Sequence, residues 1–172
     1  MRRILFTAAT FFILSSLGAQ QITDLKENTP LQDNGLEYGY SITNEASKEV
    51  KGEDFSRFEV NLYVVNRGNC IKLIPFTSST TEVADEVLIA EFSCKNATGK
   101  RLTSKSGKIN AKPWFTQVKV NDPSSSTKYK LVQAQVGYAI KSGQTISNKI
   151  IVIVPKGERP VMAVRTNYLP EL

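Results

Sequence analysis

The sequence FEVNLYVVN (58–66) alternates apolar residues with mostly polar ones and decides the class of fold. Every second residue is apolar and falls on one face of an extended chain: Phe58, Val60, Leu62 and Val64. A period of two is typical of a β-strand that buries one of its faces. Directly after it, NRGN (66–69) contains a glycine that can adopt a positive φ, which predicts a reversal of the chain.

The same alternation recurs along the rest of the chain. Further strands are predicted at 36–43, 70–76, 87–94, 113–120, 129–141, 145–155 and 161–169. The strands at 129–141 and 145–155 are predicted to pair as a hairpin. Gly137 is predicted to mark a bulge or a close approach of backbone. The run IIVIV (150–154) is apolar on both faces, which predicts a central strand.

Closely spaced strands without a convincing helical period predict an all-β fold, with residues 36–172 forming one antiparallel β-sandwich domain. An immunoglobulin-like or fibronectin-like sandwich is the first choice, and a jelly roll or a small barrel is the alternative. The single tryptophan follows the second cysteine, so the antibody-type order of cysteine, tryptophan and cysteine is absent.

Residues 1–19 have the features of a secretory signal peptide. Arg2 and Arg3 precede the uncharged run ILFTAATFFILSSL (4–17), and small residues follow it at a suitable cleavage site. The uncharged run is shorter than the roughly 20 residues that a membrane span needs. We therefore expect cleavage, a secreted or periplasmic mature chain without a membrane span, and a flexible polar leader at 20–35.

The chain has two cysteines and no histidine. In an exported protein this count predicts a disulfide between Cys70 and Cys94. Loss of chain entropy in the unfolded state would make this bond stabilise the fold by ~3–3.5 kcal/mol. Two unpaired thiols are the alternative. Two cysteines alone leave the usual zinc ligand set incomplete, so no metal and no other cofactor is predicted.

The absence of histidine also excludes the familiar His-based catalytic triads and dyads. A match to the S-x-x-K motif at 125–128 lies in a turn-like segment of a chain too small for the enzymes that use this motif. No pattern places two carboxylates across a groove, as a glycosidase requires. We therefore expect a protein that is not an enzyme.

The segment 95–112 has six lysines and arginines and no acidic residue. The candidate ligand-binding residues are Lys100, Arg101, Lys105, Lys108 and Trp114. An exported basic run indicates an acidic polysaccharide or an envelope protein as partner, whereas nucleic-acid binding would need interleaved aromatic residues and is not expected. The alternative is a strand edge that its lysines protect from aggregation.

Trp114 and Phe115 are neighbours, so one of them faces inward in a strand and the other outward. An outward Trp114 could stack on a sugar ring, and a core position is the alternative.

Three functions remain open at this point. The first is a non-catalytic binding module of the envelope or extracellular space. The second is a structural or assembly subunit of a cell-surface complex, and the third is a small secreted hydrolase or inhibitor. Exposed aromatic residues beside the basic run would favour the first, and an unpaired apolar edge strand would favour the second.

Overall fold

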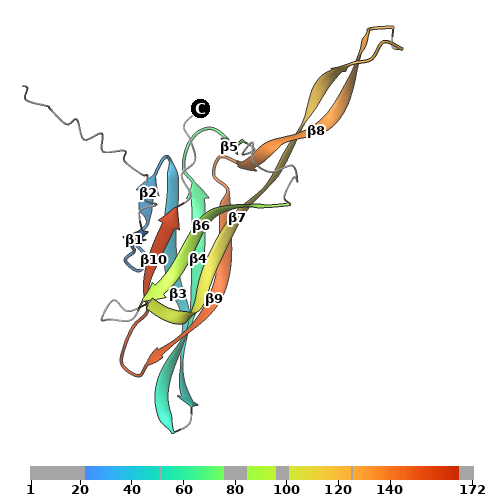
Figure 1. Cartoon of the computed structure of the whole chain (residues 1–172). Coiled ribbons are helices and arrows are strands. Elements are labelled where there is room, and N and C mark those ends of the chain that lie inside the picture. The colour runs from blue at the N-terminus through green and yellow to red at the C-terminus, as the bar shows by residue number, and fades with distance from the viewer. Residues whose placement is uncertain (1–21, 51, 76–84, 96–100, 125, 167–172) are drawn as a thin grey trace, which may run out of the picture.

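Figure 1 shows the fold of the computed structural model, which describes residues 22–50, 52–75, 85–95, 101–124 and 126–166. The predicted signal peptide lies outside these ranges. Within them every regular element is a β-strand and all strand pairs are antiparallel, which confirms the all-β prediction. No helix of the described part is long and apolar enough to cross a membrane.

The strands form two sheets. One contains six strands in the order β1 (Ile22–Asp24), β10 (Val161–Thr166), β6 (Val87–Lys95), β7 (Arg101–Asn121), β8 (Tyr129–Ile140) and β5 (Lys72–Ile74). The other contains four strands in the order β2 (Leu31–Asp33), β3 (Leu36–Val50), β4 (Glu53–Asn66) and β9 (Thr145–Pro155).

The hydrophobic core lies between the inward faces of the two sheets. The four apolar residues predicted to face inward from β4 are fully buried, with 0% exposure each: Phe58, Val60, Leu62 and Val64. The six-stranded sheet contributes Ile89, Phe92, Ile109 and Met162, among others. Burial of each such side chain stabilises the fold by about 1.5–3 kcal/mol. Two apolar sheet faces in contact are consistent with the predicted β-sandwich, while its immunoglobulin-like subtype stays a prediction.

Residues 22–24 form β1 and residues 31–33 form β2, so the prediction of a flexible leader is wrong for this part of the chain. β1 pairs with β10, and β2 pairs with β3. The N–H of Leu25 donates to the carbonyl oxygen of Met162 over 2.8 Å, and the Leu25 side chain is only 5% exposed. β1 is ordered by pairing with β10, which is distant in sequence, so the local composition carries no sign of it. β2 instead forms a local hairpin with β3 through Asn34-Gly35, where both residues have a positive φ (51° and 73°).

β8 and β9 do not pair with each other, contrary to the predicted hairpin. β8 pairs with β7 and β5, whereas β9 pairs with β4 from Thr145 opposite Val65 to Pro155 opposite Phe55. The turn between them carries the chain from one sheet to the other. β9 is also the last strand of its sheet rather than a central strand. Its far edge approaches β7, where the Asn148 side chain donates to the carbonyl oxygen of Lys108 over 3.0 Å.

Two long hairpins extend away from the packed sheets (Figure 1). The β3–β4 hairpin projects at one end of the molecule and the β7–β8 hairpin at the other. β9 follows β4 as far as Phe55, so most of the β3–β4 hairpin has a third strand beside it. The outer half of the β7–β8 hairpin has none among the described strands.

A buried asparagine joins the two sheets near the base of the β7–β8 hairpin. Asn66 is 0% exposed, and its amide nitrogen donates to the carbonyl oxygens of Cys70 and Ile140, each over 2.9 Å. Its amide oxygen accepts a hydrogen bond from the N–H of Gly68 over 2.9 Å. Both amide donors are therefore satisfied, as burial of a polar group requires.

Replacement of Asn66 by alanine should lower the free energy of unfolding by about 2–4 kcal/mol, because one buried carbonyl, one part-buried carbonyl and one N–H lose their partner. Urea denaturation of the mature chain measures the change. Asn148→Ala removes an exposed amide that makes a single bond and should cost less than about 1 kcal/mol. If both variants lost the same free energy of unfolding, burial of the Asn66 amide would not add to its contribution to stability.

Candidate functional site

The outer half of the β7–β8 hairpin, residues 115–135, projects away from the packed sheets (Figure 1), and we call it the arm. Its two strands pair from Phe115 opposite Gln135 to Asn121 opposite Tyr129. β6 accompanies β7 only as far as Ala111, and β5 accompanies β8 only from Tyr138 onward. Within the described residues the arm is thus a two-stranded ribbon with two open edges, as Figure 1 shows.

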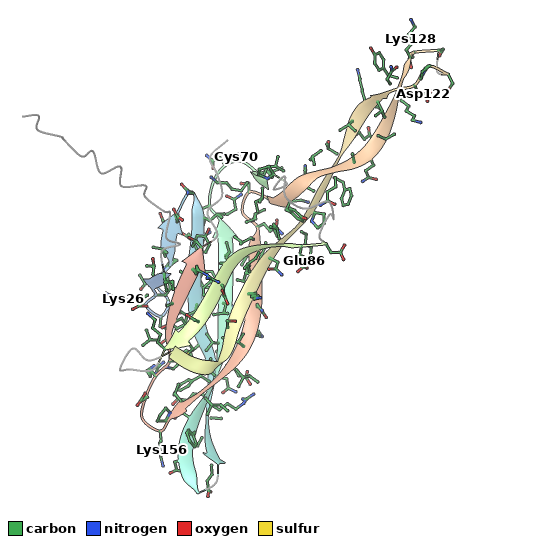
Figure 2. All side chains as sticks on the ribbon, viewed as in Figure 1. Lys26, Cys70, Glu86, Asp122, Lys128 and Lys156 are labelled. Atoms are coloured by element: carbon green, nitrogen blue, oxygen red, sulfur yellow. The ribbon has the colours of Figure 1, made fainter. Side chains whose placement is uncertain are left out.

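The tip of the arm is closed by a turn that Asp122 organises. Its carboxylate accepts hydrogen bonds from the N–H of Ser124 over 3.1 Å and from the Ser124 hydroxyl over 2.6 Å. These two bonds lower the pKa of the Asp122 carboxyl. The backbone N–H of Asp122 donates to the carbonyl oxygen of Lys128, which adopts a positive φ of 60°. Figure 2 shows Asp122 and Lys128 at the far end of the ribbon.

The root of the arm is fixed by a bulge. The register shifts between Trp114 and Phe115, which confirms the irregularity predicted at Gly137. Gly137 has a φ of +149°, and a Cβ placed on it would lie 2.4 Å from the carbonyl oxygen of Ile74 in β5. A glycine is therefore required where β5 meets β8.

Two successive aromatic residues lie at this root and face opposite sides of β7. Trp114 is half-buried, and the ammonium nitrogen of Lys141 lies 5.7 Å from the centroid of its ring, within the range of a cation–π contact. Phe115 is the outward residue of the pair, with 49% exposure. Trp114 is thus neither a core residue nor an open platform for a sugar.

The arm concentrates the exposed apolar surface of the molecule. Seven large apolar side chains are exposed in the described residues, and four of them lie here: Phe115 (49%), Val120 (38%), Tyr129 (58%) and Leu131 (59%). The cross-strand register places Phe115, Tyr129 and Leu131 on one face of the ribbon and Val120 on the other. Such a cluster on an otherwise polar surface is typical of an interaction site.

The charge of the arm is predominantly positive. The arm contains three lysines, Lys119, Lys128 and Lys130, and only one carboxylate, Asp122. The Lys130 ammonium lies 3.6 Å from that carboxylate, whereas Lys119 and Lys128 form no ion pair with any described residue. Two further lysines, Lys112 and Lys141, flank the root. An anionic partner would therefore be attracted along the whole ribbon.

The structure places only some of the predicted ligand-binding residues. Lys100 lies outside the described residues. Arg101 and Lys105 belong to the β7 backbone beside β6. Lys108 is exposed in the same strand, six residues before Trp114, which is a separation of about 20 Å along a strand.

The surroundings of Lys108 also differ from the expectation of a purely basic run. It lies opposite Glu91 of β6, which also accepts a hydrogen bond from Arg165 of β10. Burial acts to raise the pKa of the Glu91 carboxyl, but the hydrogen bond and charge of Arg165 outweigh it and lower the pKa. At the other end of the run, Lys95 pairs with Asp24 over 2.5 Å. Acidic side chains from neighbouring strands thus neutralise part of the run.

The predicted disulfide is not formed, because both cysteines are free thiols. Cys70 is exposed and lies beside the root of the arm, where its carbonyl oxygen binds Asn66. Cys94 is buried opposite Met162. β6 begins beside the root at Val87, and Cys94 follows seven residues later. Cys94 therefore lies about 23 Å along β6 from Val87. A disulfide needs Cα atoms closer than about 7 Å.

Within the described residues no group of three or more histidine, cysteine, aspartate and glutamate side chains could hold a metal ion. The feature that remains as a candidate site is the exposed apolar surface of the arm. Phe115, Tyr129 and Leu131 were not predicted as site residues, because charge pattern and catalytic motifs do not single them out. A usable signal was present, since 129–141 is partly apolar on both faces and 113–120 contains an adjacent pair of aromatic residues.

No protein-family model, no curated protein and no solved structure matches the chain.

Replacement of Gly137 by alanine should lower the free energy of unfolding by about 2–4 kcal/mol, because the new Cβ meets the backbone of β5 and the φ is unfavourable. Gly143 is the matched control. It also has a positive φ, of 71°, but a Cβ there meets nothing within 4 Å, so Gly143→Ala should cost only about 1–2 kcal/mol. Thermal or urea denaturation compares the two, and equal losses would contradict the close contact with Ile74.

The two thiols should differ strongly in reactivity. Burial raises the pKa of the Cys94 thiol to about 11, so at neutral pH this group is protonated and shielded, whereas Cys70 is exposed. Brief alkylation of the folded, non-reduced chain followed by mass spectrometry should label Cys70 alone. Both cysteines should be labelled in denaturant without added reductant. A recovered peptide pair linked through Cys70 and Cys94 would contradict this structure and restore the bridge.

Proposed function

We propose that the protein is a secreted or periplasmic, non-catalytic binding module that holds a partner protein through the arm. The observation that carries the proposal is the arm itself. It is a ribbon of two strands, projected away from the core, that exposes four large apolar side chains.

A free two-stranded ribbon is a marginal structure in water, because neither face is covered by a second layer. The exposed apolar side chains of this ribbon bury only part of their surface in the isolated chain. They become favourable when a partner covers them, at about 25 cal/mol for each Å² removed from water. A surface with Phe115, Tyr129 and Leu131 on one face is better suited to a protein than to a polysaccharide, whose hydroxyl groups would require polar partners.

The export part of the proposal rests on residues 1–19. Arg2 and Arg3, the uncharged run after them and the small residues Gly18 and Ala19 support a cleaved signal peptide. An immunoglobulin-like or fibronectin-like sandwich is part of the same proposal. The two facing antiparallel sheets support it, and such sandwiches commonly present binding loops and hairpins at their ends.

A second candidate function is that of a structural or assembly subunit of a cell-surface complex. The two open edges of the arm favour it, since unpaired edges can join a sheet of another chain. The two candidates share the arm as the contact site and differ in whether the complex is permanent.

The contact site can be tested by photo-crosslinking in the host envelope. A photoreactive amino acid replaces Leu131 on the arm, and the control replaces Ile151, which is also exposed (39%) but lies on β9 of the body. We expect a crosslink to one defined protein from position 131 and none from position 151. Crosslinks of equal yield from both positions would contradict an arm-centred site.

A shortened variant gives an independent measurement. Thr116 and Ala134 face each other across the ribbon, so replacement of residues 117–133 by Asn-Gly would close the hairpin with a two-residue turn. The free energy of unfolding should change by less than about 1 kcal/mol, and partner binding should be lost. If binding survives in this variant but is lost when Lys100, Arg101, Lys105 and Lys108 are changed to glutamine, the basic run is the site instead.

A further inference from the structure

We infer that the β8 edge of the arm is a strand-addition site, which pairs with an extended acidic segment of the partner protein. The inference rests on the proposed function, because it names how the arm would hold that partner. Four observations lead to it: the direction of the backbone groups, the strand already bound to this edge, the exposed side chains and the charge.

The hydrogen bond at the tip fixes which backbone groups face outward. The N–H of Asp122 bonds to the carbonyl oxygen of Lys128 over 2.9 Å. In an antiparallel ladder every second pair is hydrogen-bonded, so the pairs 120/130, 118/132 and 116/134 bond across the ribbon. The remaining residues of β8 direct their N–H and C=O groups away from β7: Tyr129, Leu131, Gln133 and Gln135.

One of these outward groups already has a partner, which supports the assignment. The hydroxyl of Thr127 donates to the carbonyl oxygen of Tyr129 over 2.9 Å, so that oxygen does point out of the ladder. No described strand pairs with the edge at Leu131, Gln133 or Gln135. Three successive outward residues present a regular row of donors and acceptors, which matches one side of an added strand.

The same edge binds a strand elsewhere in this chain. β5 pairs antiparallel with β8 at Tyr138, Ala139 and Ile140, on the side away from β7. Its pairing ends opposite Tyr138, close to the bulge at Gly137. The part of the edge that has no partner strand among the described residues therefore continues a row that is strand-binding at its root. The β7 edge has no such neighbour beyond Ala111, and Pro113 removes one of its donors.

The side chains along the edge suit an acidic peptide with apolar residues at alternate positions. Tyr129 and Leu131 belong to the residues whose backbone groups point outward. Their side chains lie on one face of the ribbon and are 58% and 59% exposed. Lys119 lies opposite Leu131 on the same face. An added strand would cover the two apolar side chains, and its carboxylates would meet Lys119 and Lys128, which have no ion-pair partner among the described residues.

A second copy of the chain is a poorer occupant of this edge. Symmetric pairing of β8 with β8 of another copy would bring two sets of lysines together. An acidic polysaccharide would satisfy the charge but has no row of N–H and C=O groups to pair with the backbone. An acidic protein segment satisfies both requirements.

The test uses displayed random peptides of about 10 residues, the upper length of an ordinary strand. Peptides are selected on the mature full chain and counter-selected on the variant with the shortened arm. We expect arm-dependent peptides in which aspartate or glutamate alternates with apolar residues. These peptides should lack proline. Selection of no arm-dependent peptide, or only of basic peptides, would overturn the inference.

Gln133 and Gln117 provide a matched pair of positions for the selected peptides. They face each other across the ribbon, and each directs its backbone outward, Gln133 at the β8 edge and Gln117 at the β7 edge. Gln133→Pro should weaken binding about tenfold or more, because it removes an outward N–H and its ring obstructs an added strand. Gln117→Pro, Gln117→Ala and Gln133→Ala should bind within about twofold of the parent.

Two further measurements keep the test decisive if a proline variant folds poorly. Peptides with N-methyl groups at alternate amides should lose binding to the parent chain, although their charges and side chains are unchanged. Amide hydrogen exchange should slow on peptide binding at Leu131, Gln133 and Gln135 in preference to Val132 and Ala134, which are already bonded. Strand addition would be overturned if the methylated peptides bound the parent chain as well as unmethylated ones do, and if both proline variants bound the peptides as well as the parent does.

Failure of this inference can be separated from failure of the proposed function. If the envelope crosslink from position 131 persists in the Gln133→Pro variant, the arm binds a protein but not by strand addition. If the shortened variant also retains the partner, the proposed function fails as well.

Discussion

The side chain of Asn66 holds the segments that set the position of the arm. Its three hydrogen bonds connect the end of β4 to the loop after it and to the end of β8. Its backbone adds two more bonds, to the carbonyl oxygen of Gln144 and from the N–H of Gly143. The four-stranded sheet, the last residues of β8 and the turn into β9 thus meet at one fully satisfied amide.

The arm inherits its direction from this junction and from β7. Residues 101–121 form one continuous strand, which is held by β6 in the body and by β8 in the arm. The root is further restrained by the contact between Gly137 and Ile74 and by Lys141 over the ring of Trp114. A ribbon that leaves the body from a fixed root loses less conformational freedom on binding than a loose hairpin would, which lowers the cost of association.

The sequence predicted which faces of the strands are buried better than it predicted which strands are neighbours. A period of two indicates the inward face, and the fully buried side chains from Phe58 to Val64 confirm it. The same period carries no information on pairing, so the hairpin expected between β8 and β9 is wrong and β1 was not foreseen. The β2–β3 hairpin was missed for a different reason, because its turn signal Asn34-Gly35 was interpreted as part of a flexible leader. The predicted bridge between Cys70 and Cys94 is also wrong, because cysteine count and spacing cannot show that the two residues lie at opposite ends of β6.

The candidate site could be predicted only in part for a similar reason. Trp114 was singled out and does lie at the root of the arm. Phe115, Tyr129 and Leu131 match the half-buried strand pattern as well as any core residue does. Their exposure follows from the absence of a second sheet opposite the arm in the described structure, which is a property of the tertiary arrangement and not of the local pattern.

The lysines of the arm have two effects that work in the same direction. An open ribbon with exposed Tyr129 and Leu131 would tend to pair with its own copies. Lys119, Lys128 and Lys130 oppose that pairing, because each copy would present the same charge to the other. The same charges favour an acidic partner and accelerate its approach. A partner of opposite charge is thus favoured while association between copies is disfavoured, so specificity is obtained from repulsion as well as from attraction.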